Sequence, residues 1–136
     1  MSYLEIEIDE ALENLRIENR KFNTDELKVL IAFLCKIFFG GAKFLDPNNI
    51  KIKHIEHNPG FWQEVSKRIT KDQLIFVVFD TAYRAWAIEK AEHIQCVLSE
   101  TTGYPFWITD KKFSFLIYMD DHDCVNLAEA EHGSPS

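Results

Sequence analysis

The chain has 136 residues, of which 46% are hydrophobic, and it carries a formal net charge of −7 at pH 7. This length fits one domain that buries about two thirds of its unfolded surface, and the hydrophobic content excludes a chain that is disordered throughout. The negative charge disfavours direct binding of nucleic acid, because acidic surfaces repel the phosphate backbone, and it favours either simple solubility or a basic partner.

Three cysteines, Cys35, Cys96 and Cys124, lie far apart and lack metal-ligand spacing such as Cys-x-x-Cys. We interpret them as buried, reduced thiols of a cytoplasmic protein. The start of the chain has no basic residues followed by an apolar run, so no signal peptide is expected. The longest apolar run, residues 29–39, is interrupted by Lys36 and is too short to span a bilayer, so no membrane partner is expected.

Residues 6–20 are expected to form a helix, because Ile8, Leu12 and Leu15 follow helical spacing. Residues 1–18 contain six acidic residues against one arginine, a net charge of −5. These acids form either an ordinary solvated helix face or a docking face for a basic partner, for which Glu10 and Glu13 are the candidate contacts.

A second helix is predicted to begin at residue 24, where Asn23 and Glu26 match a capping box. Its apolar stripe runs to residue 38, and Gly40 and Gly41 end it. Val29 and Phe33 widen this stripe, so we expect the helix to be buried on most sides.

A turn is expected at residues 46–49, a short strand with surface histidines at 50–55, and a short helix at 61–69. The clearest strand is 73–80, whose unbroken apolar run is typical of a central strand covered on both faces. A further strand at 84–88 and a helix at 89–101 follow.

Strands are then expected at 104–109 and 113–119, joined by a turn at 110–112. Alternation predicts that one face of the second strand carries Phe113, Phe115, Ile117 and Met119. The predicted fold is therefore α+β, with N-terminal helices packed on a mainly antiparallel sheet. A single domain is expected to cover residues 1–127, with a disordered tail at 128–136.

Four ionisable residues, Asp120, Asp121, His122 and Asp123, follow the second strand of this hairpin. Carboxylates with a histidine suit a metal site, but neighbours in an extended segment face opposite sides, so further ligands would be required. A histidine beside an aspartate also suits acid–base chemistry, but the sequence signals no nucleophile. The third interpretation is an acidic edge that faces solvent or a partner.

The aromatic residues Trp62, Trp86, Tyr104 and Trp107 have two interpretations. Aromatic side chains usually fill the core, but an exposed tryptophan or tyrosine beside acids anchors protein interfaces well. The sequence does not decide which of these side chains are exposed.

Residues 94–125 carry a family resemblance. Leu98-Ser99-Glu100, the run from Tyr104 to Asp110, the run from Phe113 to Ile117 and the ending Asp121-His122-Asp123 resemble the C-terminal part of many small bacterial proteins. These include uncharacterised families and immunity proteins of polymorphic toxin systems, some of them similar to the SUKH group. The chain departs from that pattern in having Phe115 where tryptophan is frequent and a single His122. The resemblance implies a stable scaffold with a toxin-binding surface and no active site.

These observations lead to the hypothesis of a non-catalytic cytoplasmic protein that needs no cofactor or metal and neutralises a basic toxin domain by direct contact. Such a binder would be steered to its partner electrostatically. The predicted contacts are Asp120, Asp121, His122, Asp123, Glu10 and Glu13. The alternatives are a metal- or ligand-binding domain that uses residues 121–123, and a structural or regulatory module that dimerises through its aromatic sheet. The oligomeric state stays open.

Overall fold

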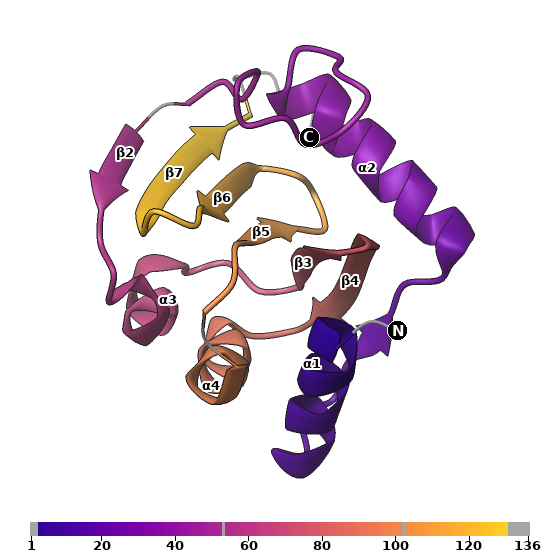
Figure 1. The fold of residues 1–136 in the computed structure, drawn as a ribbon, viewed down its shortest axis with the longest axis vertical. Coiled ribbons are helices and arrows are strands. Elements are labelled where there is room, and N and C mark those ends of the chain that lie inside the picture. The colour runs from indigo at the N-terminus through magenta and orange to yellow at the C-terminus, as the bar shows by residue number, and fades with distance from the viewer. Residues whose placement is uncertain (1–2, 53, 102, 131–136) are drawn as a thin grey trace.

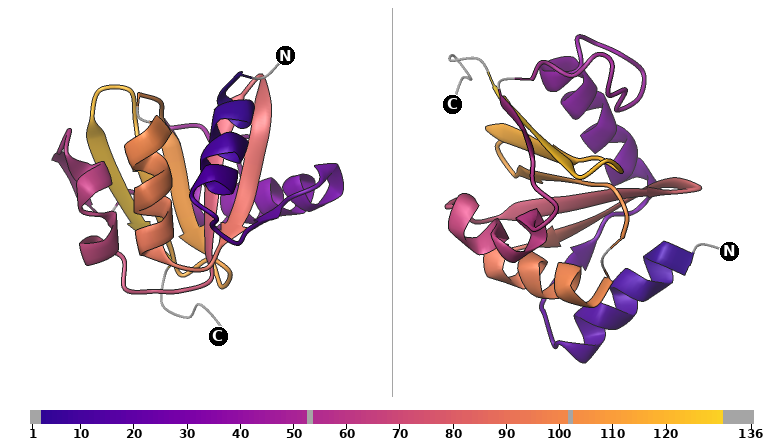
Figure 2. Two further views of the ribbon diagram at one scale, coloured as in Figure 1. Left: turned by 90° about the horizontal axis from the view of Figure 1, so that it is seen from below. Right: turned by 60° about the vertical axis from the view of Figure 1, so that its left-hand side comes forward.

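The computed structural model describes residues 3–52, 54–101 and 103–130. They form three layers, with one antiparallel sheet between two layers of helix (Figures 1 and 2). Helices α1 (Tyr3–Asn14), α3 (Val65–Arg68) and α4 (Ala91–Thr101) and the 3-10 turn η1 (Phe61–Gln63) cover one face, and α2 (Thr24–Phe38) covers the other. The predicted α+β class and antiparallel sheet are confirmed.

Within the described residues the sheet has seven strands in the order β1-β4-β3-β5-β6-β7-β2. The strands are β1 (Arg20–Lys21), β2 (His54–His57), β3 (Leu74–Asp80), β4 (Ala82–Ile88), β5 (Phe106–Asp110), β6 (Phe115–Met119) and β7 (Cys124–Glu129). Two hairpin units, β3–β4 and β5–β6–β7, meet where β5 pairs with β3. The tight turns β3–β4 and β6–β7 therefore lie at the same end of the sheet.

Strand β3 is central and covered on both faces, as predicted. Leu74, Phe76 and Val78 point into the core beneath α1 and α4, whereas Ile75 and Val77 point into the core beneath α2. All five side chains are buried. The unbroken apolar run arises because alternate residues of this strand supply two different cores.

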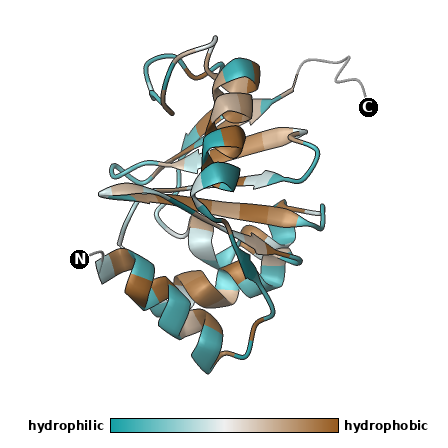
Figure 3. Cartoon of the chain, turned by 90° about the vertical axis from the view of Figure 1, so that its right-hand side faces the viewer, coloured by the Kyte–Doolittle hydropathy of each residue, from teal (hydrophilic) through white to brown (hydrophobic). Residues whose placement is uncertain are grey.

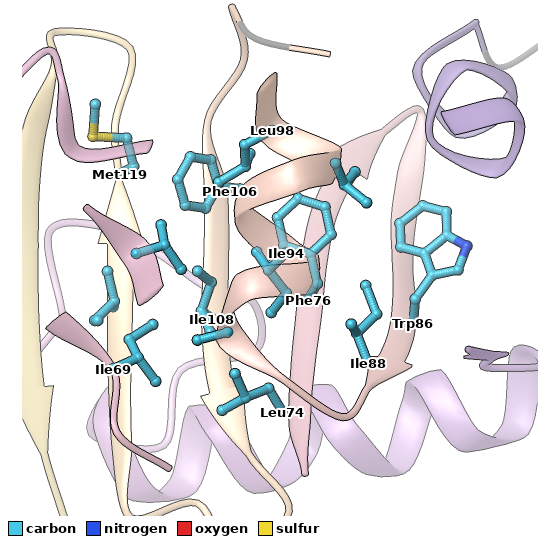
Figure 4. Packing of buried hydrophobic residues seen from close by; sticks show 14 of the residues in the cluster. Ile69, Leu74, Phe76, Trp86, Ile88, Ile94, Leu98, Phe106, Ile108 and Met119 are labelled. Atoms are coloured by element: carbon cyan, nitrogen blue, oxygen red, sulfur yellow. The ribbon is translucent and has the colours of Figure 1, made fainter. Parts of the chain in front are cut away.

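The larger core lies between the sheet and α1, α3 and α4 (Figure 4). Phe76 is at its centre, with ring centroids 6.2 Å from Trp86 and 5.7 Å from Phe106. Ile94 and Leu98 of α4 pack over these rings, and all five side chains are at least 97% buried. Such packing makes this face of the sheet a rigid support for the loops at its ends.

Helix α1 begins and ends earlier than the predicted range of 6–20. At its start, the backbone N–H groups of Leu4 and Glu5 donate to Asp80 Oδ2 at 2.8 and 3.1 Å, so a residue from the β3–β4 turn caps the helix. At its end, Arg16 has a φ of 56° and the N–H of Ile17 donates to the carbonyl of Leu12 at 2.9 Å. This left-handed closure stops the helix and turns Ile17 into the core.

Helix α2 begins as predicted but is less buried than predicted. The Glu26 N–H donates to Asn23 Oδ1 at 2.9 Å and the Asn23 N–H donates to Glu26 Oε1 at 3.0 Å, which completes the capping box. Leu34 is buried, but Val29 and Phe33 are 55% and 46% exposed. The expectation of burial on most sides is wrong, because the sheet covers only one side of this helix.

Three other expectations require correction. The strand expected at 50–55 is β2 at His54–His57, which pairs with β7 at the edge of the sheet. The helix expected at 61–69 is divided into η1 and α3. Phe113 has a φ of 55°, so β6 begins only at Phe115, and Phe113 packs on the α2 side instead of with Phe115 and Ile117.

The first residues of the predicted disordered tail are part of a strand. Ala128 and Glu129 belong to β7, and Ala128 is fully buried, so these two residues are not part of a disordered tail. Residues 131–136 of that predicted tail lie outside the described residues. Across the described ranges, every helix is too short or too polar to cross a membrane.

Candidate functional site

The four predicted contact residues 120–123 form the turn between β6 and β7. The Asp120 carboxylate accepts the backbone N–H groups of His122 and Cys124 at 2.8 and 3.0 Å. The Asp120 N–H donates to the carbonyl of Cys124 at 3.0 Å and closes the hairpin. Asp120 is half-buried, and its hydrogen bonds stabilise the turn.

The other three side chains of the turn are directed to solvent. The side chains of Asp121 and His122 are 73% and 83% exposed, with 3.6 Å between Asp121 Oδ1 and His122 Nε2. Asp123 is also exposed and has a φ of 62°, a left-handed conformation that aspartate tolerates better than most residues. The turn thus presents two solvent-exposed carboxylates, those of Asp121 and Asp123, at one end of the sheet.

A pocket of about 340 Å³ lies beside this turn, between it, η1 and the segment that joins α4 to β5. Its walls combine carboxylates with aromatic and apolar side chains, and we call it the acidic pocket. Its principal lining residues are Trp62, Tyr104, Phe106, Asp120, Asp121 and Asp123. Residues from distant parts of the chain therefore line one concave surface together with the predicted acidic cluster.

Tyr104 forms the inner wall of the acidic pocket. Its hydroxyl lies 2.7 Å from the hydroxyl of Thr101, and its ring lies edge-on to Phe106 with centroids 6.3 Å apart. Burial raises the pKa of Tyr104 above its ordinary value, and the carboxylate of Glu7 raises it further.

The acids of α1 divide into two groups. Glu5 and Asp9 face the sheet, where Lys21 Nζ approaches Glu5 Oε2 at 2.5 Å and Asp9 Oδ2 at 2.7 Å. The indole N–H of Trp86 donates to Asp9 Oδ1 at 2.9 Å. These two acids fasten the helix to β1 and β4, so they are not available to a partner.

Glu7, Glu10 and Glu13 are exposed on α1. Glu10 and Glu13 follow Glu7 one and two turns further along the helix, toward the end that lies away from the β3–β4 turn. Helix α1 is fastened to β1 and β4, whereas β6 and β7 lie toward the other edge of the sheet (Figure 1). The structure therefore places Glu10 and Glu13 apart from the β6–β7 turn.

The aromatic residues are separated by the tertiary structure. Trp86 is fully buried, and Trp107 is 6% exposed and stacks on Tyr118 with centroids 4.9 Å apart. Trp62 and Tyr104 are half-buried at the acidic pocket. Sequence reasoning identified all four aromatics as candidates, but which of them reach the pocket depends on tertiary packing.

The arrangement offers little for bound metal. Among the residues that the structure describes, no group of three or more His, Cys, Asp or Glu side chains is placed to hold a metal ion. Asp120 already accepts two backbone N–H groups, and His122 turns toward Asp121. The pocket can instead receive a positively charged group between carboxylates and aromatic rings.

Comparisons of the chain with models of protein families, with curated proteins and with solved structures found no match.

Proposed function

We propose that this is a non-catalytic binding protein that neutralises a basic toxin domain by direct contact, with the acidic pocket as the centre of the interface. The observation that carries the proposal is the meeting of the Asp121 and Asp123 carboxylates with Trp62 and Tyr104 in one pocket. The resemblance of residues 94–125 to immunity-type proteins supports the same function.

The chemistry of the pocket favours a lysine or arginine side chain as its occupant. An ammonium or guanidinium group is attracted to the face of an aromatic ring within about 6 Å of its centroid. A carboxylate beside the ring adds a charge-assisted hydrogen bond, which arginine can make with two N–H groups at once. Because the pocket is concave, the bound cation loses part of its water, and both attractions become stronger than at an open surface.

The wider charge distribution favours a basic partner. Residues 72–136 contain eleven acidic and four basic residues, a net charge of −7. Glu7, Glu10 and Glu13 add a negative ridge on α1. Such a field raises the association rate with a positively charged protein and repels nucleic acid, so the protein would compete with a nucleic-acid substrate for a basic toxin cleft.

We place this activity in the cytoplasm. All three cysteines are free thiols. Cys35 is buried as expected, whereas Cys124 is half-buried and Cys96 is exposed, so the expectation of burial is wrong for Cys96. Exposed free thiols are typical of a reducing compartment, which is where a toxin directed at intracellular nucleic acid has to be neutralised.

The decisive experiment begins with co-expression of this protein and the product of the gene immediately upstream. If that product stops growth and this protein restores it by forming a stable complex, the proposal is supported. Growth restored without a complex, or an upstream product with no effect on growth, contradicts it.

A pair of charge-matched variants then tests the pocket. Asp121→Asn with Asp123→Asn removes two charges from the pocket, whereas Glu18→Gln with Asp72→Asn removes two exposed charges at the other end of the sheet. Each variant loses two negative charges, so the long-range attraction to a basic partner falls equally in both. We expect the pocket pair to weaken binding at least tenfold by calorimetry, since close charge pairs contribute about 1.5 kcal/mol or more. Equal effects of the two pairs would remove the pocket from the interface.

A small cationic ligand is the alternative occupant, because the same pocket encloses the end of one side chain as readily as a free amine. Titration with arginine amide, lysine amide and neutral norleucine amide, followed by tryptophan fluorescence, tests the chemistry of the pocket. The two cationic amides are expected to bind weakly and the neutral amide not at all. A Kd as low for a free cation as for the protein partner would favour the small-ligand function.

A further inference from the structure

The outer side of α2 is an exposed stripe of mixed character. Val29 and Phe33 are 55% and 46% exposed, and Ala32 lies exposed between them. Asp25 precedes this apolar centre and Lys36 follows it, and both are exposed. Figure 3 shows α2 above the sheet, with hydrophobic and hydrophilic residues on the side turned to the viewer.

The apolar part of the stripe continues into a groove of about 450 Å³ between α2, the β5–β6 turn and the start of β3. Phe33 stacks on Phe113 across this groove, with ring centroids 5.7 Å apart and planes 19° from parallel. Phe22 and Ile75 line the groove floor, and Lys111 lies at its rim. The exposed ring of Phe33 and the half-buried ring of Phe113 thus belong to one largely apolar surface.

The order of residues along the stripe is self-complementary. Asp25 and Lys36 are equally distant from the point midway between Leu30 and Ile31, and so are Val29 and Ala32, and Lys28 and Phe33. If a second α2 lies antiparallel across this point on a twofold axis, each residue faces the other member of its pair. Opposite charges then meet at both ends, and apolar side chains meet in the middle.

We propose that two copies of this protein form a dimer through antiparallel α2 helices. Asp25 of each copy pairs with Lys36 of the other, and Val29 packs against Ala32, whose small side chain lets the helices approach closely. Lys28 lies over the ring of Phe33 of the other copy, where a cation–π contact is favourable. An apolar face of this kind on a single chain normally marks an interaction site, and the palindromic charges select a second copy as its occupant.

This inference is independent of the proposed function. Helix α2 lies on the opposite face of the sheet from α4 and η1, which border the acidic pocket. Dimerisation through α2 therefore leaves two acidic pockets open. A dimeric binder would engage an oligomeric partner with higher avidity than a single copy.

Charge exchange at Asp25 and Lys36 provides the test. In Asp25→Lys the two symmetric ion pairs become lysine–lysine contacts, and in Lys36→Asp they become carboxylate–carboxylate contacts. Each single variant is expected to weaken the dimer about tenfold, because two exposed pairs change from attraction to repulsion. The double variant restores opposite charges in exchanged positions and is expected to recover the dimer.

The measurement is sedimentation equilibrium of the full chain over a series of concentrations up to the millimolar range, with circular dichroism to follow folding. Both exchanges oppose the helix dipole, so the double variant has the least stable α2, and recovery of its dimer cannot result from a more stable fold. A wild-type monomer at all concentrations would overturn the proposal. A dimer that neither single variant weakens, or one that the double variant does not recover, would overturn it as well.

The Asp121→Asn and Asp123→Asn pair serves as a control. It is expected to leave the dimer unchanged, because the acidic pocket takes no part in it. Hydrogen exchange of α2 tests the other occupant. If the stripe is protected from exchange only when a toxin is bound, the toxin covers the stripe and the dimer proposal is wrong.

Discussion

Replacement of Asp120 separates the role of the β6–β7 turn from the role of the acidic pocket. The Asp120 carboxylate accepts two backbone N–H groups, from His122 at 2.8 Å and from Cys124 at 3.0 Å. Asp120→Ala leaves both donors without this acceptor in a half-buried turn, so we expect a loss of about 2 kcal/mol in the free energy of unfolding. Asp120→Asn keeps the Oδ1 acceptor and loses only the charge, so we expect a loss below about 1 kcal/mol.

Urea denaturation followed by tryptophan fluorescence measures both losses, provided that the slope of the transition is unchanged. For a domain of this size, the alanine variant should unfold about 6–10 °C lower than the wild type. If alanine and asparagine are equally destabilising, the charge matters and the acceptor geometry does not, which would refute the reasoning. If neither destabilises, the turn does not depend on Asp120.

Three further changes probe the stability of the fold. The Arg68 guanidinium, helped by Asn58, lowers the pKa of Glu56 from its ordinary 4.5 to about 2. The stability of the wild type relative to Glu56→Gln should therefore be present above pH 4.5 and vanish as the pH falls toward 2. Because both side chains are partly exposed, we expect a difference under about 1 kcal/mol in urea titrations, and a difference that grows on acidification would contradict the pairing. Asn23→Ala removes the acceptor for the Glu26 N–H and should lower the free energy of unfolding by about 1 kcal/mol, as measured by thermal unfolding. Asn23→Ser should retain most of the stability, and equal losses of stability in the two variants would exclude a capping role. Arg16 has a φ of 56°, so Arg16→Gly should stabilise the protein by about 0.5 kcal/mol in the same assay, and a destabilised variant would contradict the left-handed closure of α1.

Local patterns determined much of the fold. The α2 capping box was readable because its partners are three residues apart, and the central position of β3 was readable because a strand covered on both faces has no polar side. The hairpin β5–β6 followed from two apolar runs around a polar turn. Each of these features depends on neighbours in the chain, so the sequence alone predicts it.

Backbone reversals at single residues were not readable in the same way. Arg16 and Phe113 adopt positive φ values without being glycine, and each shortens an element that its periodicity would extend. Both conformations are held by contacts outside the turn, with Ile17 in the core beneath α1 and Phe113 against Phe33 of α2. A tertiary contact here outweighs the local preference against left-handed backbone.

The candidate site shows the same division. The sequence by itself determined that residues 120–123 form an acidic segment at the end of a strand. Only the tertiary structure decided that Trp62 and Tyr104 meet this segment in a pocket, that Asp9 is occupied by Trp86, and that the outer side of α2 stays uncovered. The physical reason is that the charge and apolarity of a side chain are local properties, whereas its availability depends on which distant surfaces pack against it.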